Sequence, residues 1–179
     1  MENKPNVWKN AMNGGIIVGV VLIIYSILMY FLDLSLEKWV SWVSYIFFIG
    51  GIVYTTIQYR DNVLGGSISY AQALGFGVLV MFFASILTAV YSFVFMTYID
   101  PDFVGKIMEM TQQQMLDQGL SEEQVEQAME MQKGFMKPGI MALITVPTYA
   151  FIGFIFSLIT SIFLKKEGVP EVFDDVEEE

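Results

Sequence analysis

The chain has 179 residues, of which 55% are hydrophobic and only 16% are charged, and its formal net charge is −10. A soluble domain usually carries about 25% charged residues, so the composition indicates a membrane protein. The absence of cysteine and histidine excludes disulfides, thiolate or imidazole metal sites and histidine-based proton transfer.

Four stretches contain no charged residue: 14–32, 39–59, 62–99 and 138–164. A helix needs about 20 apolar residues to cross a hydrocarbon core of roughly 30 Å. We therefore predict an all-α membrane protein with four transmembrane helices, three within 14–99 and the fourth at 138–164. The first stretch exceeds the apolar region of a signal peptide and no small-x-small cleavage site follows it, so we expect it to be retained.

Small residues recur within the predicted spans, where they let helix backbones approach closely. Lipid provides no hydrophobic drive for association, so such close contacts carry much of the packing energy. We expect these residues to pack helices within one chain, with a homodimer seam as the alternative. The candidate packing positions are Gly15, Gly19, Gly50, Gly51, Gly75, Gly153 and Ser157.

The third span is predicted to begin at a capping box of Ser69 and Gln72, after a Gly65-Gly66 turn. A helix from there to Ile99 measures about 45 Å, so it must tilt or protrude.

Residues 100–137 carry eight acidic residues against three lysines. Asp100 and Pro101 are expected to start one helix as its N-cap and first residue. Ser121 and Gln124 form a second capping box, and Gly119 separates the two arms. The segment is therefore predicted to be an acidic, amphipathic helical hairpin between the third and fourth transmembrane helices.

The apolar face of the hairpin's second arm is a candidate partner surface, formed by Val125, Met129, Phe135 and Met136. Packing within the hairpin and onto the bundle is the first expectation. Docking of another envelope protein on adaptable methionines is the alternative. Two Met-x-Met pairs make a weak Cu(I) motif, because residues i and i+2 point to different faces of a helix. No metal and no other cofactor is expected.

Pro147 lies inside the fourth span and deprives the carbonyl of Leu143 of its helical donor. Thr145 and Thr148 are expected to compensate locally. A structural bend is the commoner consequence of such a proline, and a hinge or gate is the alternative.

The basic residues in short segments favour a cytoplasmic location for both termini; they are Lys4, Lys9, Arg60, Lys165 and Lys166. Residues 1–13 are then a cytoplasmic segment, 100–137 are periplasmic, and 165–179 are an acidic, disordered cytoplasmic tail. Aromatic residues mark the predicted interfaces: Tyr30, Trp39, Trp42 and Tyr98 on the outer side, and Trp8, Tyr59 and Tyr70 on the inner side.

The spans contain no ionisable side chain at membrane depth, which disfavours an ion-coupled transporter. No serine has a histidine to activate it, so catalysis is not expected. Arg60 is a candidate contact for a lipid headgroup phosphate; pairing with Asp61 or anchoring the topology are the alternatives. The acidity argues against nucleic acid as a partner.

Three sets of residues carry a family resemblance: Tyr59-Arg60, Gly65 to Tyr70 with Ala73, and Tyr98-Ile99-Asp100-Pro101. Over nearly its whole length the chain resembles the domain of unknown function forty-one ninety-nine, a family associated with Bacteroidota. The resemblance implies a four-span inner-membrane protein and brings no assigned activity, catalytic residue or ligand.

We therefore expect a non-enzymatic accessory or scaffold subunit of a cell-envelope assembly in the bacterial inner membrane. Its partners would be the bilayer and another envelope protein bound through the 100–137 hairpin. The alternative is a small homodimeric transporter or channel, or a lipid-handling protein.

Overall fold

The computed structural model describes residues 6–166, and within them the chain is helical with no β-strand. The elements are α1 (Val7–Phe31), α2 (Lys38–Asn62), α3 (Tyr70–Val94), the π-helix η1 (Phe95–Ile99), α4 (Phe103–Asp117), α5 (Glu122–Lys133) and α6 (Pro138–Leu164). Four helical segments are long and apolar enough to cross a membrane: α1, α2, α6 and the continuous α3–η1. The chain is therefore a multi-pass membrane protein, as predicted.

Helix α1 begins at Val7, before the first uncharged stretch, so part of the predicted N-terminal segment is helical. The acidic tail assigned to 165–179 lies, from residue 167 onward, outside the described residues.

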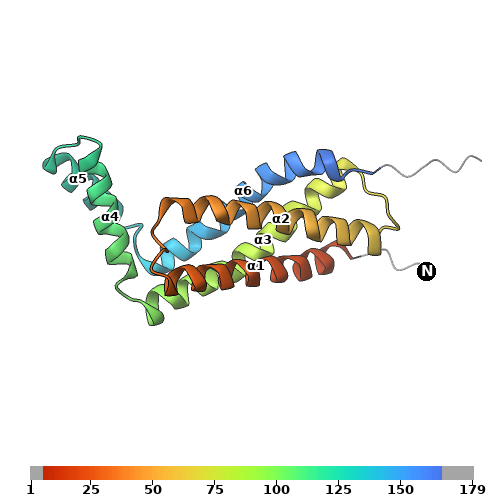
Figure 1. Ribbon diagram of the computed structural model, residues 1–179, viewed down its shortest axis with the longest axis horizontal. Helices are drawn as coiled ribbons and strands as arrows, with labels where there is room; N and C mark the ends of the chain where they lie inside the picture. Colours follow the sequence, from red (N-terminus) through yellow and green to blue (C-terminus); the bar gives the residue numbers. More distant parts are fainter. Residues whose placement is uncertain (1–5, 167–179) are drawn as a thin grey trace, which may run out of the picture.

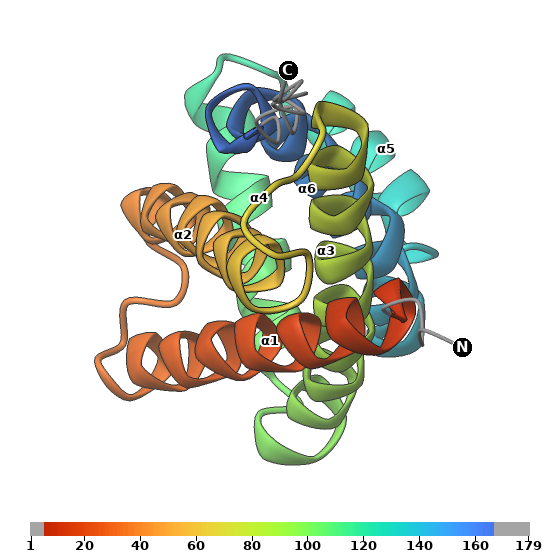
Figure 2. The same cartoon turned by 90° about the vertical axis from the view of Figure 1, so that its right-hand side faces the viewer.

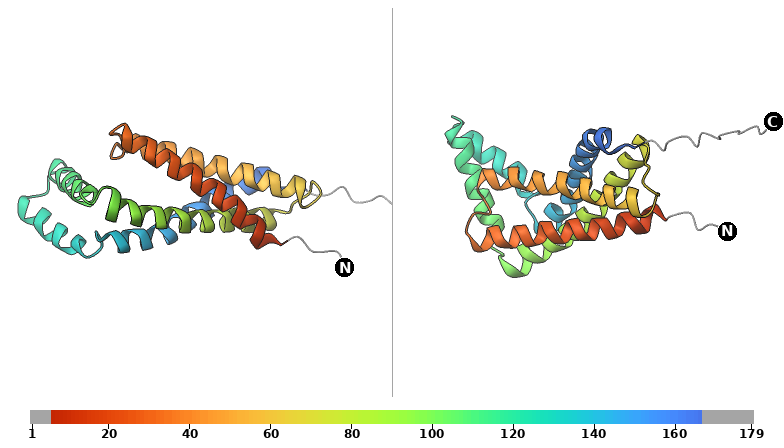
Figure 3. Two further views of the ribbon diagram at one scale, coloured as in Figure 1. Left: turned by 90° about the horizontal axis from the view of Figure 1, so that it is seen from below. Right: turned by 45° about the vertical axis from the view of Figure 1, so that its right-hand side comes forward.

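The four long helices run along the length of the molecule, and α4 and α5 stand beyond one end of them (Figure 1). The start of α1 and the end of α6 lie together at the opposite end. Seen from that end, α3 lies between α1 and α6, while α2 lies to one side (Figure 2). Two further directions show that α4 and α5 extend past the bundle (Figure 3).

Helix α3 is the centre of the bundle because one of its faces is almost wholly enclosed. Phe76, Val80, Met81 and Ala84 of this face are each at most 2% exposed. The outward faces of the long helices carry large apolar side chains, for example Trp42, Ile46, Leu143 and Phe163. Acyl chains solvate such side chains as well as a protein core does, so these faces suit contact with lipid.

Five of the candidate packing positions lie at helix contacts. A Cβ atom added at Gly15 or Gly19 of α1 would meet α3, and one added at Gly51 of α2 would meet Val18. Gly153 of α6 lies against Met81, and Ser157 is fully buried beside Gly77. Gly14 and Gly77 are further close-contact positions, which the four-residue spacing of small residues did not reveal.

Gly50 and Gly75 are not packing positions within the described chain. Both are exposed, and no other described atom lies within 4 Å of a Cβ added at either position. Each of these two glycines lies on the outward face of its helix. The rotation of α2 turns the next residue, Gly51, toward α1 instead.

The two predicted capping boxes are confirmed. In both, the serine hydroxyl accepts from the backbone N–H three residues on, and the glutamine side chain accepts from the serine N–H. Gly119, in the turn between α4 and α5, has φ +88°, a conformation that favours glycine.

The predicted start of the first arm at Asp100-Pro101 is wrong. Helix α4 begins at Phe103, and the backbone of Asp100 is not helical, with φ −134° and ψ 83°. The Asp100 carboxylate accepts from the Nζ of Lys106 instead of capping the helix. An ion pair with a lysine of α4 itself takes the place of the predicted cap.

Pro147 lies within α6 on an exposed face. The hydroxyls of Thr145 and Thr148 donate to the carbonyls of Met141 and Ile144. The expectation that they compensate the carbonyl of Leu143 is therefore wrong. A helix threonine reaches the carbonyl three or four residues before it, and neither Thr145 nor Thr148 lies at that spacing from Leu143. The hinge at Pro147 stays a prediction.

The aromatic residues of the predicted interfaces do not behave alike. Trp8, Trp39, Trp42 and Tyr98 are exposed near helix ends. Tyr59 is only 5% exposed and stacks on Phe76, with ring centroids 4.1 Å apart. Tyr59 is thus a core residue, and its assignment to the inner aromatic belt is wrong.

Candidate functional site

The end of the bundle at which α1 begins and α6 ends is closed by a joint between the α2–α3 loop and the end of α6. Gly65 and Gly66 take φ of +70° and +92°, which turns the chain back toward α6. Ile68 and Lys166 then exchange two backbone hydrogen bonds, with N···O distances of 2.8 and 2.9 Å. The Tyr70 hydroxyl donates to the carbonyl of Leu158, 3.3 Å away.

Arg60 is part of this joint. Its Nε and Nη2 donate to the two carboxylate oxygens of Asp61 at 2.7 and 3.1 Å, and its Nη1 donates to the carbonyl of Leu164 at 3.4 Å. Leu164 ends α6, where free carbonyl groups attract a cation. The guanidinium therefore links α2 to α6, and a contact between Arg60 and a lipid phosphate stays a prediction.

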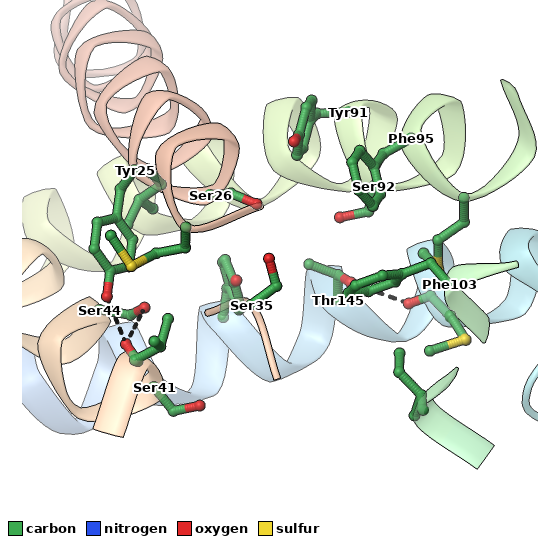
Figure 4. Close-up of a pocket in the computed structure, with 17 residues that line it drawn as sticks. Tyr25, Ser26, Ser35, Ser41, Ser44, Tyr91, Ser92, Phe95, Phe103 and Thr145 are labelled. Carbon is green, nitrogen blue, oxygen red and sulfur yellow. Dashed lines mark hydrogen bonds between the residues drawn. The ribbon is translucent and has the colours of Figure 1, made fainter. Parts of the chain in front are cut away.

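At the opposite end of the bundle, a cavity of about 330 Å³ opens between the four long helices, η1 and α4 (Figure 4). Among the described residues, its polar side chains all carry hydroxyl groups and none is charged. They are Tyr25 and Ser26 of α1, Ser35 of the following loop, Ser41 and Ser44 of α2, Tyr91 and Ser92 of α3, and Thr145 and Tyr149 of α6. Phe95 of η1 and Phe103 of α4 add aromatic walls.

Some of these hydroxyls are engaged and others are free. Tyr25 and Ser44 both donate to the carbonyl of Val40, at 3.0 and 3.1 Å. The hydroxyls of Ser26, Ser35 and Ser92 point into the same space (Figure 4). The cavity thus contains hydrogen-bonding groups that the protein itself does not use.

Helix α4 is fixed over this cavity by an ion pair. Lys106 Nζ lies 2.8 Å from Oδ2 of Asp100, whose side chain is 8% exposed. The Lys106 hydrogen bond holds the pKa of the Asp100 carboxyl below its usual range, although desolvation acts in the opposite direction. The same hydrogen bond raises the pKa of Lys106.

These pKa shifts predict how the ion pair depends on pH. Asp100 stabilises the fold above its ordinary pKa of about 3.9, and this contribution is lost as the pH falls through the lowered value. Lys106 contributes below its ordinary pKa of about 10.4 and ceases to do so as the pH rises through the raised value. We expect Lys106→Met to lower thermal stability at pH 7 and this deficit to shrink as the pH falls below the ordinary carboxyl pKa. Lys133→Met is the control, and a deficit that does not shrink on acidification would contradict the assignment.

A second hollow, of about 630 Å³, lies between α4 and α5. We call it the acidic cleft. Its floor is apolar and includes Val125, which is 1% exposed, and Met129, which is 9% exposed. Its walls carry four carboxylates and one amine: Glu109, Glu122, Glu126, Glu130 and Lys133.

The four candidate partner-face residues do not form one exposed surface. Val125 and Met129 are buried between α4 and α5, whereas Phe135 is 64% exposed and Met136 is half-buried. The difference arises because α5 ends at Lys133, so Phe135 and Met136 do not continue its helical face. Within residues 6–166, no three acidic side chains converge to hold a metal ion.

The model of a family described as "Protein of unknown function (DUF4199)" matches residues 13–166. The chain belongs to the DUF4199 family. The resemblance seen in the sequence is thereby confirmed. No curated protein and no solved structure matches the chain.

In this DUF4199 protein, several of the residues that carry the resemblance connect helices. Arg60 and the segment from Gly65 to Tyr70 form the joint between the α2–α3 loop and α6. Asp100, after η1, pairs with Lys106 and holds α4 over the hydroxyl-lined cavity. The motifs therefore mark how the elements are connected.

The cavity hydroxyls of this DUF4199 protein could not be predicted from the sequence. They come from positions 25 to 149 on four helices and one loop, with no common spacing. Serine in a transmembrane helix is an ordinary packing residue, so no local signal distinguished Ser26 or Ser92.

Proposed function

We propose that this DUF4199 protein is a non-enzymatic accessory or scaffold subunit of a cell-envelope assembly in the bacterial inner membrane. Both termini would be cytoplasmic, and α4 and α5 would form a periplasmic helical hairpin. The acidic cleft is the observation that carries this proposal, because it combines an apolar floor with carboxylate walls at the far end of the molecule.

The charge pattern of α5 supports a basic partner. Glu122, Glu126 and Glu130 follow one another at four-residue steps, a spacing at which like charges repel. A Lys- or Arg-rich segment of another envelope protein would relieve that repulsion. Its apolar side chains would at the same time cover Met129 and its neighbours. We therefore propose such a segment as the occupant of the cleft.

Charge reversal within the cleft tests this role. The tagged protein, at its natural expression level, is purified in native nanodiscs, and retained proteins are quantified by mass spectrometry. We expect Glu126→Lys/Glu130→Lys to lower recovery of a basic partner by about tenfold or more, since close charge pairs dominate such contacts. Asp117→Lys/Glu123→Lys changes the net charge equally outside the cleft and should retain the partner.

Equal recovery with both double variants would contradict the proposal. Recovery of self-copies alone would also contradict it and would favour the homodimeric alternative.

The proposed orientation has a separate test, made simple by the absence of native cysteine. Gln113 of α4 is exposed, so Gln113→Cys in intact cells should react with a maleimide that cannot cross the inner membrane. A Lys9→Cys variant, near the other end of the bundle, should react only after lysis. The reverse pattern would place α4 and α5 in the cytoplasm.

The second candidate function is a small homodimeric transporter or channel, or a lipid-handling protein. The hydroxyl-lined cavity favours it, because uncharged pores and sites need no buried charge. In that case Pro147 would be the hinge and Arg60 the contact for a lipid headgroup. Flux in proteoliposomes that Pro147→Ala abolishes would support transport.

A further inference from the structure

The hydroxyl-lined cavity beside α4 has the size and placement of a ligand site. Small-molecule sites start at about 300 Å³, and this one measures about 330 Å³. Five helices and η1 contribute to its wall. Its lining includes Phe95 and Met96 from η1, and π-helical turns occur frequently at functional sites.

The free hydroxyls define what the cavity can bind. In the described part of the chain, no side-chain hydrogen bond involves Ser26, Ser35 or Ser92, which point into the cavity. The phenolic oxygen of Tyr91 is buried and has no partner among the described residues. Each hydroxyl can donate one hydrogen bond and accept others, so together they match a ligand that also carries hydroxyl groups.

The absence of charge from the described lining excludes ionic ligands. A phosphate or carboxylate would find no lysine or arginine, and an ammonium group would find no carboxylate. Moving an unpaired charge out of water is strongly unfavourable. Phe95, Phe103 and Tyr149 supply apolar walls, which suit the carbon faces of a sugar or a glycerol backbone.

The depth of the cavity suggests how such a ligand arrives. Ser26 lies five residues before the end of α1 at Phe31, which is roughly 8 Å along the helix axis. Ser26 is therefore nearer to one end of the span than to its middle. A lipid headgroup and a small free polyol are the two sources from which such a ligand could come.

We propose that this cavity binds an uncharged, hydroxyl-bearing group of the sugar or glycerol type, which Ser26 and Ser92 recognise. This assignment does not depend on the partner proposed for the acidic cleft. A lipid and a free polyol share the recognising chemistry, and the experiment distinguishes them.

The test uses the full-length protein in nanodiscs that contain equal amounts of monoglucosyldiacylglycerol and phosphatidylglycerol. Native mass spectrometry then measures which lipid remains bound. Equilibrium dialysis of detergent-solubilised protein with radiolabelled glucose and glycerol is the second arm. We expect the neutral glycolipid to be retained. Ser26→Ala/Ser92→Ala should reduce its retention about tenfold, because two hydrogen bonds are lost.

Ser67→Ala/Thr148→Ala is the matched control, since neither residue lines the cavity, and it should bind like the native protein. Thermal unfolding of all variants shows that they are folded. If glucose or glycerol binds with the same dependence on Ser26 and Ser92, the ligand is the free polyol. Preferential retention of phosphatidylglycerol, retention that the double variant leaves unchanged, or binding of none of the probes would overturn the proposal.

Discussion

Replacing Gly15 with leucine is expected to destabilise the protein by about 3 kcal/mol, the upper end of the range for overpacked cores. A Cβ atom at Gly15 would lie 2.5 Å from the Cβ of Phe83 and 2.7 Å from the carbonyl oxygen of Val80. The oxygen belongs to the backbone of α3, which cannot rotate aside as a long side chain can. The new side chain therefore has to push α1 away from α3.

The same substitution at Gly50 is the matched control. No described atom lies within 4 Å of a Cβ added there, and leucine favours a helix over glycine by up to about 1 kcal/mol. Stability should therefore stay the same or rise slightly. The free energies are measured by reversible unfolding in mixed micelles of mild detergent and dodecyl sulfate, followed by tryptophan fluorescence.

Two results would contradict this description of how the helices pack. Equal tolerance at both positions would mean that α1 does not contact α3 through Gly15. Destabilisation at Gly50 that depends on protein concentration would place Gly50 in a seam between two copies.

Features that depend on composition or on a few neighbouring residues were predictable. Four apolar stretches identified the spans, because length and hydropathy alone decide whether a helix can cross lipid. The capping boxes at Ser69 and Ser121 were predictable because all their partners lie within three residues. Both boxes are present in the structure.

Features that depend on the rotation of a helix were not predictable. Apolar side chains lie on both the exposed and the buried sides of the long helices, since one side meets lipid and the other meets protein. Hydrophobic periodicity therefore could not tell that Gly51 faces α1 while Gly50 faces outward. The prediction that Asp100 caps a helix was wrong because its carboxylate pairs with Lys106, six residues further on.

The acidic cleft and the hydroxyl-lined cavity also differ in how far the sequence predicts them. The charges that line the acidic cleft were visible in the sequence, but the burial of Val125 and Met129 depends on how α5 packs against α4. The hydroxyl cavity was invisible, because only the fold brings Ser26, Ser35 and Ser92 to one place.

Tyr59 provides the sharpest test of helix rotation. Its position near the C-terminal end of α2 suits a residue at the membrane interface, whereas its burial suits a core residue. Replacing Tyr59 with alanine is expected to remove about 3 kcal/mol of stability. Its ring is 5% exposed and lies nearly parallel to that of Phe76, with an interplanar angle of 3°. Aromatic-to-alanine changes in soluble cores cost about 3–5 kcal/mol. The lower end applies here, since separated helices still keep the ring in lipid.

Tyr98→Ala is the control, because it deletes the same side chain where it is 74% exposed. Its removal leaves no cavity in the core, so we expect a loss below about 1 kcal/mol, from weaker anchoring at the interface. The unfolding assay used for Gly15 compares the two, and neither variant removes a tryptophan. If Tyr98→Ala proved the more damaging change, Tyr59 would have to face lipid. The α2 helix would then be rotated, and Arg60 would leave the carbonyl of Leu164 that it now contacts.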